Sequence, residues 1–124
     1  MMKICNTYSS EFIWIANILF SKECQKEIGC QIYLYTNTNF LYDEFGFISY
    51  RLKDDIYLFD YDYILPQYRG YGKYKDLFKE REFICWGKLC KIETKNILLK
   101  QFLLKNSYEI IKINGSWTFF QKHL

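Results

Sequence analysis

The feature that most constrains this chain is a strand-like segment that passes through a turn with two glycines into a helix. The segment "YILPQYRGYGKYKDLF" spans residues 63–78 and places Gly70 and Gly72 just before the helical pattern. Glycine lets the backbone approach a bound group closely. The first N–H groups of a helix also carry the positive end of the helix dipole. The turn therefore predicts an anion site of the kind that holds phosphate groups.

Two nucleotide-binding motifs do not fit these glycines. A dinucleotide-binding G-x-G-x-x-G motif that starts at Gly70 has Lys75 at its third glycine position. A phosphate-binding loop that ends at Gly72 and Lys73 requires glycine at Gln67 and serine or threonine at Tyr74. Both motifs are therefore excluded.

Hydrophobic periodicity predicts a single α/β domain over residues 1–124, built around a mixed central sheet with flanking helices. A strand-helix-strand unit over residues 56–94 should form a parallel pair of strands. The Asn114-Gly115 dipeptide predicts the turn of a final hairpin. The expected elements before the hairpin begin with a strand at 3–5, a helix from residue 12 to Gly29 capped by Ser9 or Ser10, and strands at 30–37, 45–52 and 56–65 with a turn at 53–55 between the last two. They continue with a helix over 74–85, a strand at 88–94 and a short helix marked by residues 97–103 and closed near residues 106–107.

The six residues 67–72, QYRGYG, satisfy the pattern Q/R-x-x-G-x-G/A. This pattern is the pyrophosphate-binding signature of the GNAT superfamily of N-acetyltransferases, which the sequence resembles here. Further matches follow in order: "KLCKIET" stands at the family's next strand, Asn96 opens the following helix, and "KNSYEII" replaces the usual K-x-G-F-E ending. The resemblance covers residues 45–121 and implies the GNAT fold.

The resemblance also implies a binding site for acetyl-coenzyme A. The backbone amides of residues 67–72 would hold the pyrophosphate, with charge added by Arg69 and Lys73. The strand would split from its neighbour near Ile64 and Leu65, where freed backbone groups bind the pantetheine arm. The residues expected to bind the coenzyme are Ile64, Leu65, Gln67, Tyr68, Arg69, Gly70, Tyr71, Gly72, Lys73 and Asn96.

The chemistry that the resemblance implies is acetyl transfer to a primary amine of a small cation, a peptide or a protein. An alkyl amine with a pKa of about 10.4 is neutral in roughly one molecule in 2,500 at pH 7, so a base must remove its proton. Asp60 aligns with the family's usual carboxylate, and Asp62 follows on the same face of the expected strand. Burial beside aromatic residues would raise the pKa of either group. Six acids within residues 42–66 also favour a cationic acceptor.

One departure from the family's pattern leaves an alternative open. Many members have a tyrosine seven residues after the asparagine, where it protonates the leaving thiolate, and this chain has Leu103 there. Tyr108 takes the place of a core phenylalanine, so packing is its expected role. The alternative is a coenzyme A binding module that regulates or binds a partner with little or no catalysis. Ten bases within residues 67–105 also raise a nucleic-acid binder as a third, less favoured hypothesis.

Cysteine and histidine usage argues against a metal site. The five cysteines form no C-x-x-C pair and the only histidine is His123, so we expect reduced, packed thiols and no zinc. The apolar segment 12–20 is too short to span a membrane and lacks a basic leader, which favours the cytoplasm. The expected partners are acetyl-coenzyme A and an amine, with a homodimer left open.

Overall fold

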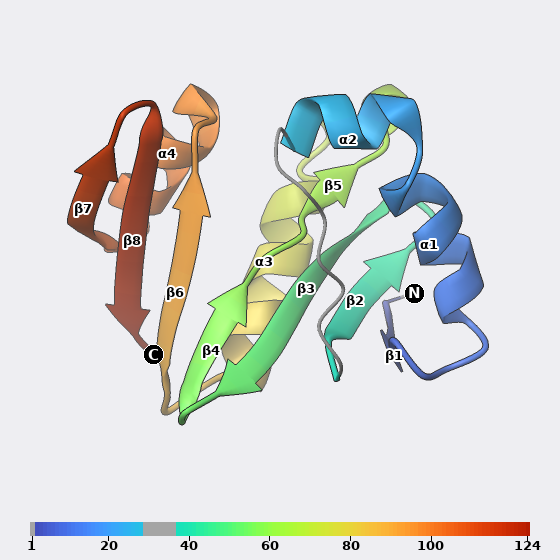
Figure 1. Ribbon diagram of the computed structural model, residues 1–124, viewed down its shortest axis with the longest axis horizontal. Helices are drawn as coiled ribbons and strands as arrows, with labels where there is room; N and C mark the ends of the chain where they lie inside the picture. The colour runs from blue at the N-terminus through green and yellow to red at the C-terminus, as the bar shows by residue number, and fades with distance from the viewer. Residues whose placement is uncertain (1, 29–36) are drawn as a thin grey trace.

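A single mixed sheet organises the computed structural model, which describes residues 2–28 and 37–124 (Figure 1). The strands run in the order β1-β2-β3-β4-β6-β8-β7, and β5 pairs with β3 beyond the end of β4. The predicted α/β fold with a mixed, helix-flanked sheet is confirmed. The elements are β1 (Lys3–Asn6), α1 (Phe12–Leu19), α2 (Lys22–Ile28), β2 (Asn39–Asp43), β3 (Gly46–Lys53), β4 (Ile56–Phe59), β5 (Tyr63–Ile64), the 3-10 turn η1 (Pro66–Tyr68), α3 (Lys73–Ile84), β6 (Leu89–Thr94), α4 (Ile97–Lys105), β7 (Glu109–Asn114) and β8 (Trp117–His123).

The helices cover the two faces of this sheet, and each face has its own hydrophobic core. Neighbouring strand residues point to opposite faces. On β2, Phe40 therefore packs with α1 and α2, whereas Leu41 packs with α3 and α4. On β3, Phe47 and Ile48 divide in the same way. The two cores fix the sheet between its helices.

The sheet splits where β4 ends, which is the feature that creates a site. β4 and β6 are parallel, as predicted, and their pairing runs from Ile56 opposite Leu89 to Phe59 opposite Ile92. Beyond Phe59 the chain pairs with β3, through β5, and with no other strand of the described residues, while β6 continues away from it (Figure 1). The strand predicted as continuous over residues 56–65 is therefore interrupted at residues 60–62. Its two pieces have different neighbours, and this difference opens the sheet.

Two hairpin predictions are confirmed, with one shift in position. β3 and β4 form an antiparallel pair, and the turn between them places Asp54 and Asp55 at positive φ values of 52° and 66°. β7 and β8 form the final hairpin, but its two loop residues are Gly115 and Ser116. Only Gly115 takes a positive φ there, at 63°. Asn114 instead pairs with Trp117 as the last residue of β7.

The N-terminal region differs most from the prediction. The single helix expected from residue 12 is two helices, α1 and α2, which are separated at Phe20 and Ser21. No side chain in the described part of the chain caps α1, whose N-cap residue is Glu11. The hydroxyl of Ser9 accepts a hydrogen bond from the Asn6 amide instead. β2 lies at Asn39–Asp43, where no strand was expected, and the strand predicted at 30–37 falls almost wholly outside the described residues. No helix in the described part of the chain is long and apolar enough to cross a membrane.

The cysteines of the described residues are free and packed, as expected. Cys5, Cys24, Cys85 and Cys90 are all buried. Burial raises the pKa of the Cys5 thiol to about 11 and of the Cys24 thiol to about 12, so both stay protonated at neutral pH. These thiols therefore act as small core residues.

Candidate functional site

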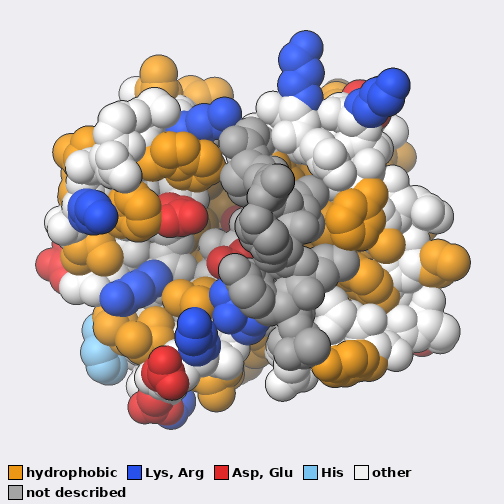
Figure 2. Space-filling view, viewed as in Figure 1, with side chains coloured by type: hydrophobic (Ala, Val, Ile, Leu, Met, Phe, Trp, Pro, Cys, Tyr) orange, Lys and Arg blue, Asp and Glu red, His pale blue; other side chains and the backbone are white. Residues whose placement is uncertain are grey.

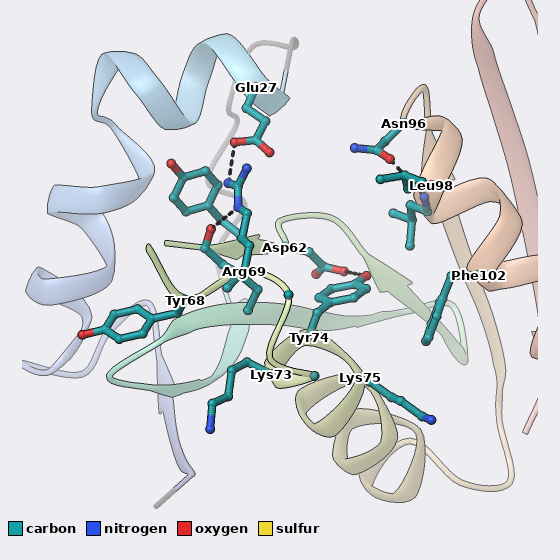
Figure 3. A pocket seen from close by; sticks show the side chains of 15 residues that line it. Glu27, Asp62, Tyr68, Arg69, Lys73, Tyr74, Lys75, Asn96, Leu98 and Phe102 are labelled. Carbon is teal, nitrogen blue, oxygen red and sulfur yellow. Dashed lines mark hydrogen bonds and ion pairs between the residues drawn. The ribbon is translucent and has the colours of Figure 1, made fainter. Parts of the chain in front are cut away.

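A cavity of about 480 Å³ opens beside the split in the sheet (Figure 3). One side is formed by β5 and the turn that follows it, and the other side by the start of α4. The first residues of α3 close its base (Figure 3). The cavity thus lies at the point where the glycine turn and the split strands meet.

The glycine turn presents an open backbone surface to this cavity. Gly70 and Gly72 both line it, with φ values of 85° and 77° that side-chain-bearing residues rarely adopt. A Cβ atom added at either glycine would meet no atom of residues 2–28 and 37–124 within 4 Å. Gly72 is also the N-cap residue of α3 and has no side chain with which to occupy the first amide groups. An anion can therefore reach the positive end of a 12-residue helix.

Arg69 crosses from this turn into the cavity. Its Nε donates a hydrogen bond of 2.9 Å to the carbonyl of Ile64, which belongs to β5. Its Nη2 lies 2.6 Å from a carboxylate oxygen of Glu27 at the end of α2, and its guanidinium lies 5.2 Å from the centre of the Tyr63 ring (Figure 3). Both side chains of the ion pair are about 40% exposed, so solvent reaches them. Arg69 thus links three elements around the cavity.

The opposite wall is apolar and ends in one amide. Leu98, Leu99 and Phe102 of α4 line the cavity. Asn96 caps α4, because its side-chain oxygen accepts a hydrogen bond of 3.0 Å from the Leu99 amide. Its amide nitrogen points toward the middle of the cavity (Figure 3). This wall suits a long chain of mixed apolar and amide character.

A buried ion pair holds the split segment in place. Arg81 of α3 is completely buried and contacts both carboxylate oxygens of Asp62, at 2.6 and 2.9 Å. Tyr74 donates a hydrogen bond of 2.7 Å to the same carboxylate, and the Ser49 amide lies 3.4 Å from it. Burial, and then the charge of Asp62, raise the pKa of Tyr74 well above its ordinary value, so its hydroxyl stays protonated. Asp62 is therefore held by three neighbours.

Asp60 has a more open environment than Asp62. Its side chain pairs with Arg51, whose Nε lies 3.1 Å from one carboxylate oxygen. The hydroxyl of Ser49 accepts hydrogen bonds from the amides of Asp60 and Tyr61, at 3.2 and 2.7 Å, and so fixes the backbone. Burial raises the pKa of Asp60, while the charge of Arg51 lowers it less. Asp60 combines a raised pKa with access to solvent.

A second, smaller cavity of about 150 Å³ lies on the side of Asp60. Among the residues that the structure describes, its lining includes four acids, Glu27, Asp60, Asp62 and Glu93, and one base, Lys95. Burial, and then the charge of Asp60, raise the pKa of Glu93. On the face seen in Figure 2, acidic side chains are visible on the β6 side of the atoms that are not described. The two cavities share Glu27, Asp62, Asn96 and Leu99 in their walls.

The structure brings most of the expected coenzyme-binding residues to the larger cavity. Those that line it are Ile64, Tyr68, Arg69, Gly70, Gly72, Lys73 and Asn96. Leu65, Gln67 and Tyr71 do not line it, and the Leu65 amide donates to the Phe45 carbonyl at 2.9 Å. The Tyr68 ring packs edge-on against Phe45 at 4.8 Å, and the Lys73 ammonium lies 3.9 Å from the centre of the same ring.

Leu103, which stands where the resemblance places the proton-donating tyrosine, and the nearby Tyr108 both lie in the hydrophobic core. Leu103 is completely buried and packs with the residues under α3 and α4. Tyr108 is 3% exposed, and its hydroxyl donates a hydrogen bond of 3.0 Å to Glu82. Burial raises the pKa of Tyr108 above its ordinary value. The packing role expected for Tyr108 is confirmed.

Four residues at the site were not anticipated from the sequence. They are Tyr74 and Arg81 of α3, Glu27 of α2 and Glu93 of β6. Arg81 carries the one usable signal, because it is a charged residue between the apolar positions of its helix, and such a residue indicates a buried partner.

No group of three or more His, Cys, Asp or Glu side chains within residues 2–28 and 37–124 is arranged to hold a metal ion. No protein-family model matches the sequence, and no curated protein matches it. Solved structures, in contrast, do match the chain.

Three of those structures, named as acyl- or acetyltransferases, share little sequence with this chain. An acyl-CoA N-acyltransferase from Pseudomonas aeruginosa has 9% identity over 98% of both chains and a TM-score of 0.73. A GNAT-family acetyltransferase from Staphylococcus aureus has 16% identity over 98% of both chains and a TM-score of 0.62. The PaiA N-acetyltransferase from Thermoplasma acidophilum, solved in complex with coenzyme A, has 21% identity over 95% of this chain and 81% of that chain, with a TM-score of 0.60. These likenesses concern the fold.

Proposed function

We propose that this chain, whose fold is that of the GNAT superfamily, is an acetyl-coenzyme A dependent N-acetyltransferase. It transfers the acetyl group directly to a primary amine of a small cationic molecule, a peptide or a protein. The observation that carries the proposal is the position of Gly70 and Gly72, which open on a cavity beside the split in the sheet. The complex of a protein with this fold and coenzyme A supports the choice of ligand.

The coenzyme fits the larger cavity with its pyrophosphate at the glycine turn and its thioester at the opposite end. The pyrophosphate lies on the backbone amides of the glycine turn, at the start of α3. The pantetheine arm runs along Ile64 of β5 on one side and the α4 wall with Asn96 on the other. This direction brings the thioester to the wall that the two cavities share, close to the carboxylates.

Asp60 is the proposed base. It removes a proton from the acceptor's ammonium group, directly or through a water molecule. The neutral nitrogen attacks the thioester carbonyl carbon and a C–N bond forms. The C–S bond then breaks, the nitrogen loses its second proton to solvent as it becomes the amide, and the coenzyme A thiolate takes a proton from solvent. Asp62 positions this segment, because Arg81 and Tyr74 already occupy its oxygens.

The test is release of free thiol from acetyl-coenzyme A in the presence of polyamines, aminoglycosides, peptides and aminoacyl-tRNA. We expect amine-dependent release that falls at least about 100-fold in Asp60→Asn. Asp54→Asn is the matched control, because it makes the same chemical change in an exposed turn. Undiminished release in Asp60→Asn rejects this assignment of the base.

A coenzyme A binding module without catalysis is the second candidate. The burial of Leu103 favours it, because the position where the resemblance places a catalytic tyrosine faces the core. Coenzyme binding without thiol release for any acceptor would support this candidate over the enzyme. The free, buried thiols fit a reducing compartment, and we propose the cytoplasm.

A further inference from the structure

Arg69 contacts a backbone carbonyl and a carboxylate at the site where the proposed function places coenzyme A. Its Nε bonds to the Ile64 carbonyl, on the strand along which the pantetheine arm would run. Its Nη2 pairs with Glu27, and the pair lies beside the turn that would receive the pyrophosphate (Figure 3). A bound pyrophosphate and the Glu27 carboxylate would therefore compete for one guanidinium.

The pyrophosphate should win this competition. A half-exposed ion pair such as Arg69–Glu27 contributes little free energy, because solvent screens it. Arginine binds phosphate groups through strong, paired hydrogen bonds, and the dipole of α3 adds to the attraction. An unpaired Glu27 would also repel the incoming anion, which favours its movement away from Arg69.

Glu27 is placed so that its release affects the second cavity. It lines both cavities and stands with Asp60, Asp62 and Glu93 around the smaller one. Arg51 neutralises Asp60 and Arg81 neutralises Asp62. A freed Glu27 would therefore add a negative charge that a cationic acceptor can bind.

We propose that Glu27 is a specificity residue that exchanges Arg69 for the cationic acceptor when coenzyme A binds. The coenzyme then binds first, and the acceptor binds more tightly to the loaded protein. By linkage, the acceptor increases coenzyme affinity by the same factor. This inference rests on the proposed function, since it assumes that coenzyme A occupies the larger cavity.

Calorimetric titration of coenzyme A tests the exchange. Glu27→Gln should bind coenzyme A about two- to tenfold more tightly than the wild type, because the competing carboxylate is gone. Glu23→Gln is the control: it removes the same charge from the same helix, at an exposed residue that does not line either cavity. Glu27→Gln affinity equal to or weaker than that of Glu23→Gln overturns the proposal. A wild type that does not bind coenzyme A would instead reject the proposed function.

Titration of spermidine tests the acceptor side. The wild type should bind spermidine about fivefold or more tightly when coenzyme A is bound, and Glu27→Gln should lose this preference. Spermidine that binds equally to the free and loaded protein, or to neither, would remove the acceptor part of the proposal. Neither result would affect the proposed binding of coenzyme A.

Discussion

Arg81 and Asp62 form a bidentate ion pair that joins α3 to the segment where the sheet splits. The two nitrogen-to-oxygen distances are 2.6 and 2.9 Å, and the arginine side chain is completely buried. Arg81 also donates a hydrogen bond of 2.9 Å to the Ser49 carbonyl on β3, and its guanidinium lies 3.9 Å from the centre of the Phe59 ring. One side chain therefore fixes the segment that separates the two cavities.

Replacing Arg81 should lower the free energy of unfolding of the protein. Arg81→Met leaves the Asp62 carboxylate, only 12% exposed, without its charged partner. Loss of one partner of a buried pair costs about 3–5 kcal/mol. Urea unfolding monitored by circular dichroism measures this loss. Arg69→Met, which breaks a pair of about 40% exposure and one hydrogen bond to the Ile64 carbonyl, should cost about 1–2 kcal/mol, and equal losses in the two variants would contradict the structural role of Arg81.

The pH dependence of activity should report Asp60. The base works only when deprotonated, so activity falls as the pH drops through its pKa. Burial raises the pKa of Asp60, which places the acidic limb of kcat/KM above the ordinary value of about 3.9. Arg51 lowers this pKa, so Arg51→Gln should move the limb to higher pH. If the limb stays in place or moves to lower pH, the group that titrates in the pH profile is not Asp60.

Gly72 should matter more for the coenzyme than for stability. Gly72→Ala places a side chain at a φ of 77°, which costs about 1–2 kcal/mol of folding free energy, and its Cβ would occupy the open surface of the turn. We expect coenzyme A affinity to fall at least about tenfold. Gly115→Ala imposes a similar φ in the distant β7–β8 turn. This control should lose stability but keep coenzyme affinity, and a comparable affinity loss in it would argue against a local effect.

Tyr74 should act as a support for Asp62. Its hydroxyl donates to that carboxylate and stays protonated, so Tyr74→Phe should cost about 1 kcal/mol of stability and slow turnover less than about tenfold. Thermal unfolding and steady-state kinetics check both effects. Turnover that is slowed about 100-fold or more would instead identify Tyr74 as the proton donor to the thiolate.

The sequence predicted the parts of the fold that depend on local chemistry. The glycine turn before α3 and the strand-helix-strand order behind the parallel pair β4–β6 each specify one geometry. The Asn-Gly dipeptide predicts the final hairpin, but the loop lies one residue later, at Gly115 and Ser116. The interruption at residues 60–62 has no such signal. It depends on Ser49, which binds two amides of that segment, and on Arg81, which lies far away in the sequence.

The candidate site was predictable where backbone groups form it and less so where side chains do. Periodicity describes the polarity of a position but not its partner, so the pairing of Arg81 with Asp62 could not be read from the pattern. The link between Glu27 and Arg69 spans 42 residues and joins two exposed positions. Surface ion pairs of that kind leave no trace in hydrophobic patterning.

The most direct measurement is a crystal structure of the protein grown with acetyl-coenzyme A. We predict the pyrophosphate on the amides of Gly70 and Gly72, the pantetheine arm between Ile64 and Asn96, and the thioester next to the cavity that contains Asp60. Coenzyme bound elsewhere on the protein, or no bound coenzyme at millimolar concentration, would contradict the proposed site.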